Sequence, residues 1–196
     1  MNIIIIDYGA GNIQSLRFAL KRLGYKPELS NDPEKIWHAD RVIFPGVGEA
    51  SSAMNKLKNK GLDKLIPTLK QPVLGICLGM QLMCESSEEG NTKGLGVFPL
   101  RVKKFENEHI KVPQIGWNEI SDLKTGLYKE VRENEFMYFV HSYYIPDNKW
   151  AIAKTNYGID YASSIQKDNF TGCQFHPEKS SLPGEKILIN FLLQNN

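Results

Sequence analysis

A cysteine between two glycines, in Gly75-Ile76-Cys77-Leu78-Gly79, is the feature that most constrains how this chain can fold. The apolar segment Pro72-Val73-Leu74 before it is typical of a buried strand, and the residues after it, Met80–Glu85, are good helix formers. A nucleophile between a strand and a helix sits on a sharp turn, where a neighbouring Cβ would clash, so glycines are needed on both sides. The motif therefore predicts a strand–turn–helix with Cys77 at the turn.

The sequence also supplies candidate partners for this thiol. The positive N-terminal end of the following helix favours the reactive thiolate. His176 and Glu178 lie in Phe175-His176-Pro177-Glu178, where the carboxylate could accept from one ring nitrogen and leave the other to face the thiol. A histidine after a strand is often only structural, but Glu178 favours a catalytic role. His141 also ends a predicted strand, but it has no acid within two positions and is the weaker candidate base.

A second glycine-containing loop, Pro45-Gly46-Val47-Gly48, could complete the site. Glycines on both sides of Val47 allow its peptide orientations that are closed to other residues. Placed beside Cys77, this loop could present a backbone N–H to an anionic intermediate, and the N–H of Leu78 would be the second donor. A plain strand-to-helix turn is an equally acceptable interpretation of the loop.

Strand and helix signals alternate in the first half of the chain. Ile3–Ile6 and Arg41–Phe44 are apolar runs typical of buried parallel strands, and helices are expected around Leu16–Leu23 and over Ala50–Lys58. The second half is richer in short strands, expected at Val97–Phe105, Glu135–Val140, Ala151–Thr155, Ala162–Gln166 and Thr171–Phe175, before a last helix over Pro183–Leu193. We expect a single α/β domain over residues 1–196, with a mostly parallel central sheet flanked by helices.

Composition excludes several classes of function. The 24 basic and 22 acidic residues leave a net charge of +2, which does not indicate nucleic-acid binding. No apolar run approaches the roughly 18 residues of a membrane span, and the start of the chain does not resemble a signal peptide. Three cysteines without disulfide-like spacing fit a reducing compartment, so a cytoplasmic protein is expected.

Cofactor and metal motifs are weak. Gly9-Ala10-Gly11 follows a strand, but Gln14 stands where a dinucleotide-binding fingerprint needs glycine. Cys173 and His176 have a spacing that a zinc site could use, with Cys77 or Cys84 as a further ligand, but four converging ligands are not evident. Neither a metal nor a cofactor is expected.

Several of these segments together resemble the class I glutamine amidotransferases. The resemblance is carried by Pro45–Gly48, Gly75–Gln81 and Gln174–Glu178, and is narrowed to one group of the family by Ile6–Asn12, Pro113–Asn118 and Phe175–Ser180. It extends from Ile3 to the last helix and implies the three-layer fold of that family. Two departures are visible: Gln114 stands where histidine is expected, and Glu49-Ala50 replaces a small-then-aromatic pair. Gln114 could alter the partner-facing surface or the substrate pocket.

The resemblance implies roles for individual residues. Cys77, His176 and Glu178 would form a catalytic triad that hydrolyses glutamine, with an oxyanion held by Val47 and Leu78. Gly46, Gly48, Gln81, Glu89, Ser142 and Tyr143 would bind glutamine, although Glu89 could equally be a solvated charge in an acidic run.

The resemblance also implies a partner. In this group of the family the ammonia passes through a tunnel into a (β/α)8-barrel cyclase subunit of histidine biosynthesis, which forms a heterodimer with the glutaminase. Asn12, Trp117 and Lys179 would lie at that interface, and an ordinary core tryptophan is the alternative for Trp117. The isolated chain is expected to be a poor glutaminase, because the Val47 peptide awaits reorientation when the partner binds its ligand.

Three other interpretations stay open. The chain could serve a different synthase, such as one that aminates surface sugars, and copurification with a barrel cyclase would separate these. It could be a cysteine peptidase or thiol-redox protein, which would cleave peptides or oxidise Cys77 reversibly without responding to glutamine. It could be a non-catalytic binding protein that keeps the fold, although the intact Cys77, His176 and Glu178 argue against this.

Overall fold

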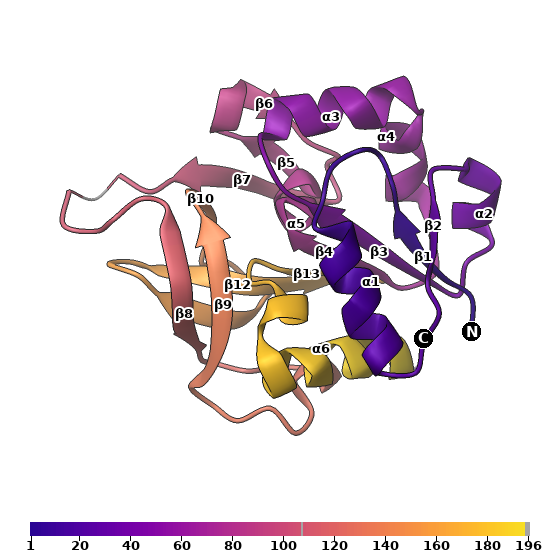
Figure 1. Ribbon diagram of the computed structural model, residues 1–196. Helices are drawn as coiled ribbons and strands as arrows, with labels where there is room; N and C mark the ends of the chain where they lie inside the picture. Colours follow the sequence, from indigo (N-terminus) through magenta and orange to yellow (C-terminus); the bar gives the residue numbers. More distant parts are fainter. Residues whose placement is uncertain (107, 195–196) are drawn as a thin grey trace.

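The structure is a computed structural model that describes residues 1–106 and 108–194. The helices are α1 Ile13–Arg22, α2 Pro33–Trp37, α3 Ala50–Asn59, α4 Leu62–Leu65, α5 Leu78–Leu82 and α6 Ser181–Leu193, and a 3-10 turn, η4, covers Pro177–Lys179. The strands are β1 Ile3–Ile6, β2 Glu28–Ser30, β3 Arg41–Gly46, β4 Val73–Cys77, β5 Cys84–Ser87, β6 Thr92–Lys93, β7 Phe98–Lys104, β8 Gln114–Ile120, β9 Glu135–His141, β10 Tyr143–Pro146, β11 Ala151–Asn156, β12 Asp160–Lys167 and β13 Phe170–Cys173. Figure 1 shows their arrangement.

A large sheet runs through the molecule in the order β2-β1-β3-β4-β13-β12-β10-β7-β5-β6, and β11 pairs with β12. The strands from β2 to β13 are parallel, and β12 begins the antiparallel part. Parallel strands present their carboxyl ends at one edge, so the loops after β3, β4 and β13 meet there. This edge receives the Val47 loop, Cys77 and the segment of His176.

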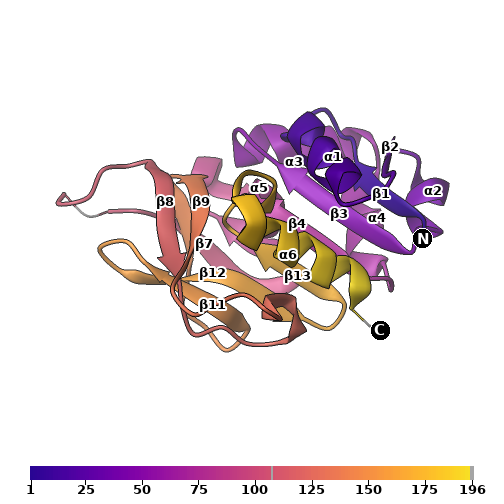
Figure 2. The same ribbon diagram turned by 60° about the horizontal axis from the view of Figure 1, so that its bottom comes forward.

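Each face of the parallel sheet has its own apolar core. Ile4 and Ile6 of β1 pack in one core with α3, α4 and α5, whereas Ile3 and Ile5 pack in the other with α1 and α6. Successive side chains of a strand point to opposite faces, so a continuous apolar strand is buried on both sides. The result is a three-layer α/β arrangement, visible from a second direction in Figure 2.

A separate two-stranded ribbon, β8 paired antiparallel with β9, stands beside the large sheet. Residues along the ribbon alternate between more buried and more exposed positions. Successive side chains of a strand point to opposite faces, so one face of the ribbon is buried and the other is exposed. Strand β9 ends at His141 next to Cys77 and His176, so the ribbon forms a wall of the cavity at the sheet edge.

The glycines around Cys77 are required by close packing. A Cβ on Gly79 would lie 1.9 Å from the carbonyl oxygen of Phe44 in β3, and a Cβ on Gly75 would lie 2.9 Å from the backbone nitrogen of Met80. The first is a backbone contact that no side-chain rotation can relieve. The prediction that glycines are needed on both sides of the turn therefore has a direct steric basis.

We expect Gly79→Ala to destabilise the protein by about 3 kcal/mol, at the upper end of overpacking effects, because α5 must move away from β3. The free energy of unfolding measured in urea checks this. Gly126→Ala is the matched control, since nothing lies within 4 Å of a Cβ there and its backbone is not left-handed. Equal stability of the two variants would contradict the steric argument.

Several element predictions need correction. The helix expected over Met80–Glu85 ends at Leu82, and Cys84, expected on it, begins β5. The cause is tertiary. The carbonyls of Leu82, Met83 and Cys84 accept from the N–H groups of Leu95, Phe98 and Gly96, respectively, instead of continuing the helix. Strand β8 and the short strands β2, β5, β6 and β10 were not expected as strands, whereas β1, β3, β4 and the helix at Ala50 were predicted closely.

Candidate active site

Cys77 lies at the last position of β4, immediately before α5. Its backbone has φ 53° and ψ −112°, a conformation that non-glycine residues rarely adopt and that is concentrated at functional sites. The carbonyl oxygen of Val140 lies 3.7 Å from the sulfur, and the side-chain amide of Gln174 donates to it at 3.6 Å. The predicted strand–turn–helix therefore exists and places the thiol at the strained turn.

His176 and Glu178 lie together beside this thiol. The Nδ1 of His176 is 2.9 Å from Oε1 of Glu178, which also accepts from the side-chain amide of Asn12 at 3.2 Å. The backbone of His176 is fixed in turn, because its N–H donates to the carbonyl of Tyr138 and its carbonyl accepts from Ser180. A histidine held in this way by a carboxylate presents its other ring nitrogen in a defined direction.

The neighbours of His176 favour its protonated form. Burial would lower the pKa of His176, but a negatively charged Cys77 that hydrogen-bonds the ring, together with Glu178, outweighs burial and raises it to about 10. The imidazole is therefore protonated at neutral pH when the sulfur is a thiolate. A thiolate beside an imidazolium is both a nucleophile and a source of the proton that a leaving group needs.

A cavity of about 310 Å³ opens in front of Cys77. It brings together most of the residues that the sequence singled out: Val47, Gly48, Cys77, Leu78, Gln81, Glu89, Ser142, Tyr143, His176 and Lys179, with Pro113, Val140 and His141 completing the lining. Glu178 lies behind His176, and its side chain is 2% exposed.

One side of the cavity carries polar groups at fixed positions. The side-chain amide of Gln81 donates to the backbone carbonyl of Tyr143 at 3.0 Å and to Oε1 of Gln174 at 2.8 Å. Glu89 accepts from the N–H of Ala50 at 2.9 Å, so it is not a freely solvated charge. Burial raises the pKa of Glu89, the N–H of Ala50 lowers it in part, and the neighbouring Glu49 raises it further.

The loop after β3 also lines the cavity, through Val47 and Gly48. Val47 is 41% exposed, and Gly48 has φ +91°, a left-handed conformation that glycine permits. Gly46 does not line the cavity: a Cβ there would lie 2.6 Å from the N of Gly79, so this glycine allows β3 to approach α5. The hydroxyl of Tyr8 donates to the carbonyl of Pro45 at 3.1 Å and anchors the loop from below.

Three residues near the sulfur were missed or undervalued by the sequence analysis. Gln174, fully buried just after β13 ends at Cys173, contacts both Cys77 and Gln81. Its place in the motif Gln174–Glu178 is the signal that could have found it. The carbonyl of Val140 carries no side-chain signal. His141 lines the cavity, but burial lowers its pKa to about 4, so it is neutral at pH 7.

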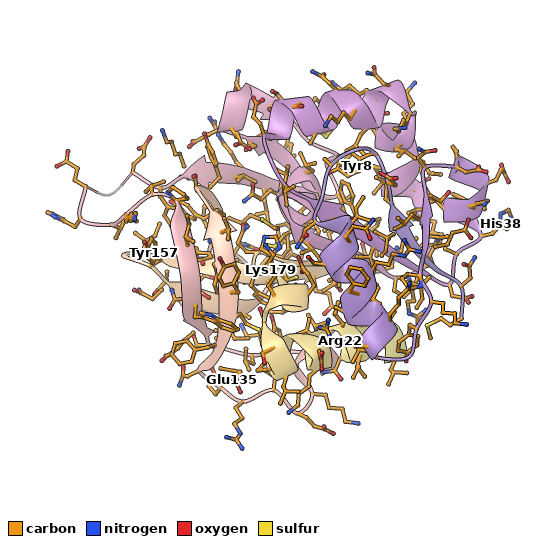
Figure 3. The ribbon with its side chains drawn as sticks, viewed as in Figure 1. Tyr8, Arg22, His38, Glu135, Tyr157 and Lys179 are labelled. Atoms are coloured by element: carbon orange, nitrogen blue, oxygen red, sulfur yellow. The ribbon has the colours of Figure 1, made fainter. Side chains whose placement is uncertain are left out.

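Trp117 and Lys179 lie on the outer side of this region. Trp117 is 51% exposed on β8 and packs edge-on against Tyr138 of β9, with ring centroids 5.9 Å apart, so it is not a core tryptophan. The Nζ of Lys179 lies 5.7 Å from the centre of the Tyr138 ring. Figure 3 shows Lys179 between the β8–β9 ribbon and α1, and Lys179 is one of the residues that line the cavity.

Gln114 is buried rather than partner-facing. It is 2% exposed at the start of β8, and its side chain contacts the hydroxyl of Tyr161 at 3.0 Å. The presence of Gln114 in place of the expected histidine therefore changes the interior behind the cavity.

A metal site needs a cluster of ligand side chains, and a helix that crosses a membrane must be long and apolar. Over residues 1–106 and 108–194, no group of three or more His, Cys, Asp or Glu side chains could hold a metal ion. Within the same residues, none of the helices has the length and apolar character to cross a membrane.

An α/β sheet that carries a cysteine on a strand-to-helix turn beside a histidine–carboxylate pair is typical of enzymes that use a thiolate as nucleophile. The family model for class-I glutamine amidotransferases matches residues 4–195. The chain belongs to the class I glutamine amidotransferase family.

Relatives and solved structures agree with this assignment. The chain is 52% identical over 194 residues to the imidazole glycerol phosphate synthase subunit HisH of Bacteroides fragilis, and 43% identical to that of Escherichia coli; each match covers 98% of this chain and 99% of the relative. A putative GMP synthase protein from Thermoplasma acidophilum superposes with a TM-score of 0.75 at 21% identity, covering 98% of this chain and 92% of that one. The structural match supports the fold.

Proposed function

We propose that this chain is the glutaminase subunit of an imidazole glycerol phosphate synthase, which hydrolyses glutamine to glutamate and ammonia for a cyclase subunit in histidine biosynthesis. The convergence of Cys77, His176 and Glu178 at one cavity carries the proposal. The high identity to proteins named as this subunit, over nearly their full length, supports the choice of pathway.

The first half of the reaction uses the ion pair. The Cys77 thiolate attacks the side-chain carbonyl carbon of glutamine and forms a tetrahedral oxyanion. The N–H of Leu78 and a peptide N–H of the Val47 loop stabilise that oxyanion. The C–N bond then breaks, and His176 gives its proton to the departing nitrogen, which leaves as ammonia while a thioester remains on Cys77.

The second half regenerates the enzyme. His176, now neutral and still held by Glu178, removes a proton from a water molecule, whose oxygen attacks the thioester carbonyl. Collapse of the second tetrahedral intermediate expels the Cys77 thiolate and releases glutamate. The net reaction is glutamine plus water to glutamate plus ammonia.

The α-amino and α-carboxylate groups of glutamine need partners in the rest of the cavity. Glu89 and the Gln81 side chain face this space and are our candidates for orienting the substrate, with Ser142 and Tyr143 backbone groups for the carboxylate. Gly48 belongs to the same lining, and Gly46 contributes by letting β3 pack close to α5.

The outer face of the β8–β9 ribbon is our candidate for the cyclase interface. Ile115, Trp117 and Phe136 are 60%, 51% and 48% exposed on it, and Val140 continues the ribbon into the cavity lining. An exposed apolar face of this kind indicates a docking surface. Because the face borders the cavity, a (β/α)8-barrel partner seated there, with Asn12 and Lys179 at the edge, would receive ammonia without its release to bulk water.

Glutamate release from glutamine tests the proposal. It is measured for the chain alone, with the cyclase subunit, and with the cyclase subunit plus its nucleotide ligand. We expect weak turnover alone and strong stimulation in the full mixture, because a reoriented Val47 peptide completes the oxyanion site. Cys77-dependent turnover without stimulation would indicate another partner, such as a sugar-aminating synthase, and no turnover in any mixture would reject the glutaminase assignment.

Trp117→Ala should weaken cyclase binding by about 30-fold, the effect of losing roughly 2 kcal/mol at an interface hot spot. Trp37→Ala is the matched control: Trp37 is 48% exposed, but it ends α2 on the side of the molecule away from β8 and β9. Isothermal titration of each variant with the cyclase subunit gives the Kd. Equal losses for both tryptophans would remove the β8–β9 face as the interface.

A further inference from the structure

Three buried side chains behind the cavity form a chain of hydrogen bonds. Nδ1 of His141 lies 2.7 Å from the carbonyl of Tyr143, and its Nε2 lies 3.2 Å from the hydroxyl of Tyr161. That hydroxyl is 3.0 Å from the side-chain amide of Gln114. His141, Tyr161 and Gln114 are 6%, 0% and 2% exposed, so each polar atom must find its partner within the protein.

The direction of each hydrogen bond follows from counting protons. A carbonyl only accepts, so Nδ1 of His141 carries a proton toward Tyr143. His141 is neutral, so its Nε2 has a lone pair and accepts from the only proton of the Tyr161 hydroxyl. Thr155, which also contacts Tyr161, donates its own proton to the carbonyl of Glu119 and therefore supplies none to the Tyr161 oxygen.

Gln114 must then donate to Tyr161. If the amide oxygen of Gln114 faces Tyr161, its Nε2 is buried without a partner. The Gln114 oxygen and Nε2 of His141 would then compete for the single proton of the Tyr161 hydroxyl. A half-turn of the amide places Nε2 toward Tyr161 and moves Oε1 to the position without a partner. In this orientation Nε2 donates to the Tyr161 oxygen, and the hydrogen bonds run in a single direction.

We propose that Gln114 is a positioning residue for the glutaminase site: it donates to Tyr161, which donates to His141, and this order keeps the proton of His141 on Nδ1 and anchors the Tyr143 carbonyl in the cavity. The inference rests on the proposed function only for the role of that cavity. The same carbonyl accepts from Gln81, so the chain fixes one wall of the pocket from behind.

The charged and titratable groups around His141 explain why the direction of these hydrogen bonds matters. His176 faces it across the cavity, and Tyr161 faces it from β12; the rings of Phe105 and Phe139 cover the remaining sides. Because Nδ1 already carries a proton, a second proton on Nε2 would make His141 positively charged beside the His176 imidazolium, which disfavours it. An amide at position 114 avoids this, because it can donate, whereas a carboxylate only accepts.

The test is the tautomer and titration of His141 in the full chain, followed by long-range ¹H–¹⁵N NMR of the imidazole rings and assigned with His141→Asn. We expect the Nδ1–H tautomer with no titration between about pH 5.5 and 8, consistent with its lowered pKa. An Nε2–H tautomer, or titration near pH 6.5, would overturn the inference. This readout needs no glutamine, so it stands or fails separately from the proposed activity.

Two substitutions separate the hydrogen-bonding role of Gln114 from its role in packing. Gln114→Glu should reverse the chain and raise the pKa of His141 by at least about one unit, with kcat/KM for glutamine falling progressively toward acid pH relative to the native chain. Gln114→Met fills the same space without a donor or acceptor and should leave His141 neutral. An unchanged His141 in Gln114→Glu, or an activity loss that is equal at every pH, would mean that Gln114 only packs.

Discussion

Cys77→Ser is expected to lower glutamine hydrolysis by roughly 10⁴- to 10⁶-fold, the size of effect seen when a hydrolase loses its nucleophile. A serine hydroxyl is far less acidic than a thiol, so it does not become an anion beside the His176 imidazolium. The measurement is glutamate release in the presence of the cyclase and its ligand. The thermal midpoint should change little, because serine has the same shape and lies at the cavity wall.

Cys84→Ala is the matched control for this prediction. Cys84 is also buried, but its sulfur lies 3.9 Å from the carbonyl of Met80 in the core and does not line the cavity. Its variant should keep most of the activity. A Cys77→Ser chain that retains more than about a hundredth of native turnover would contradict a nucleophilic role.

His176→Asn should reduce kcat by about 10³- to 10⁴-fold, the contribution of a well-placed acid–base group. Asparagine can keep a hydrogen bond to Glu178, but it cannot deliver a proton to ammonia or take one from water. His38→Asn is the control, because His38 is exposed beside α2 and remote from the cavity. Comparable losses for both variants would argue against the assigned base.

The raised pKa of His176 predicts how the stability of the folded protein depends on pH. The pKa of His176 is raised to about 10 in the folded protein, against about 6.5 for an unperturbed histidine. Protonated His176 therefore contributes stability that is fully present below about pH 6.5 and is lost as the pH rises toward 10. The free energy of unfolding in urea should fall more between pH 7 and 10 in the native chain than in His176→Asn. An equal fall in both chains would contradict the raised pKa of His176.

Much of the parallel half of the fold could be predicted, because its signals are local. The apolar run Ile3–Ile6 can only be a strand buried on both faces, and the glycines beside Cys77 can only serve a tight turn. The helix over Ala50–Asn59 has its apolar residues at helical spacing. The antiparallel half was harder: β8 contains Gly116 and Asn118, which have poor strand propensity, and it exists because β9 pairs with it.

The sequence by itself determined which residues could do chemistry here: a cysteine on a glycine-bounded turn, a histidine with a carboxylate two positions away, and a loop whose glycines allow unusual peptide orientations. Tertiary structure decided what surrounds them. Gln174, the Val140 carbonyl and the His141–Tyr161–Gln114 chain reach the site from strands that are distant in sequence. Such contacts depend on which strands become neighbours in the sheet and on which polar groups are buried together, and local residue patterns encode neither.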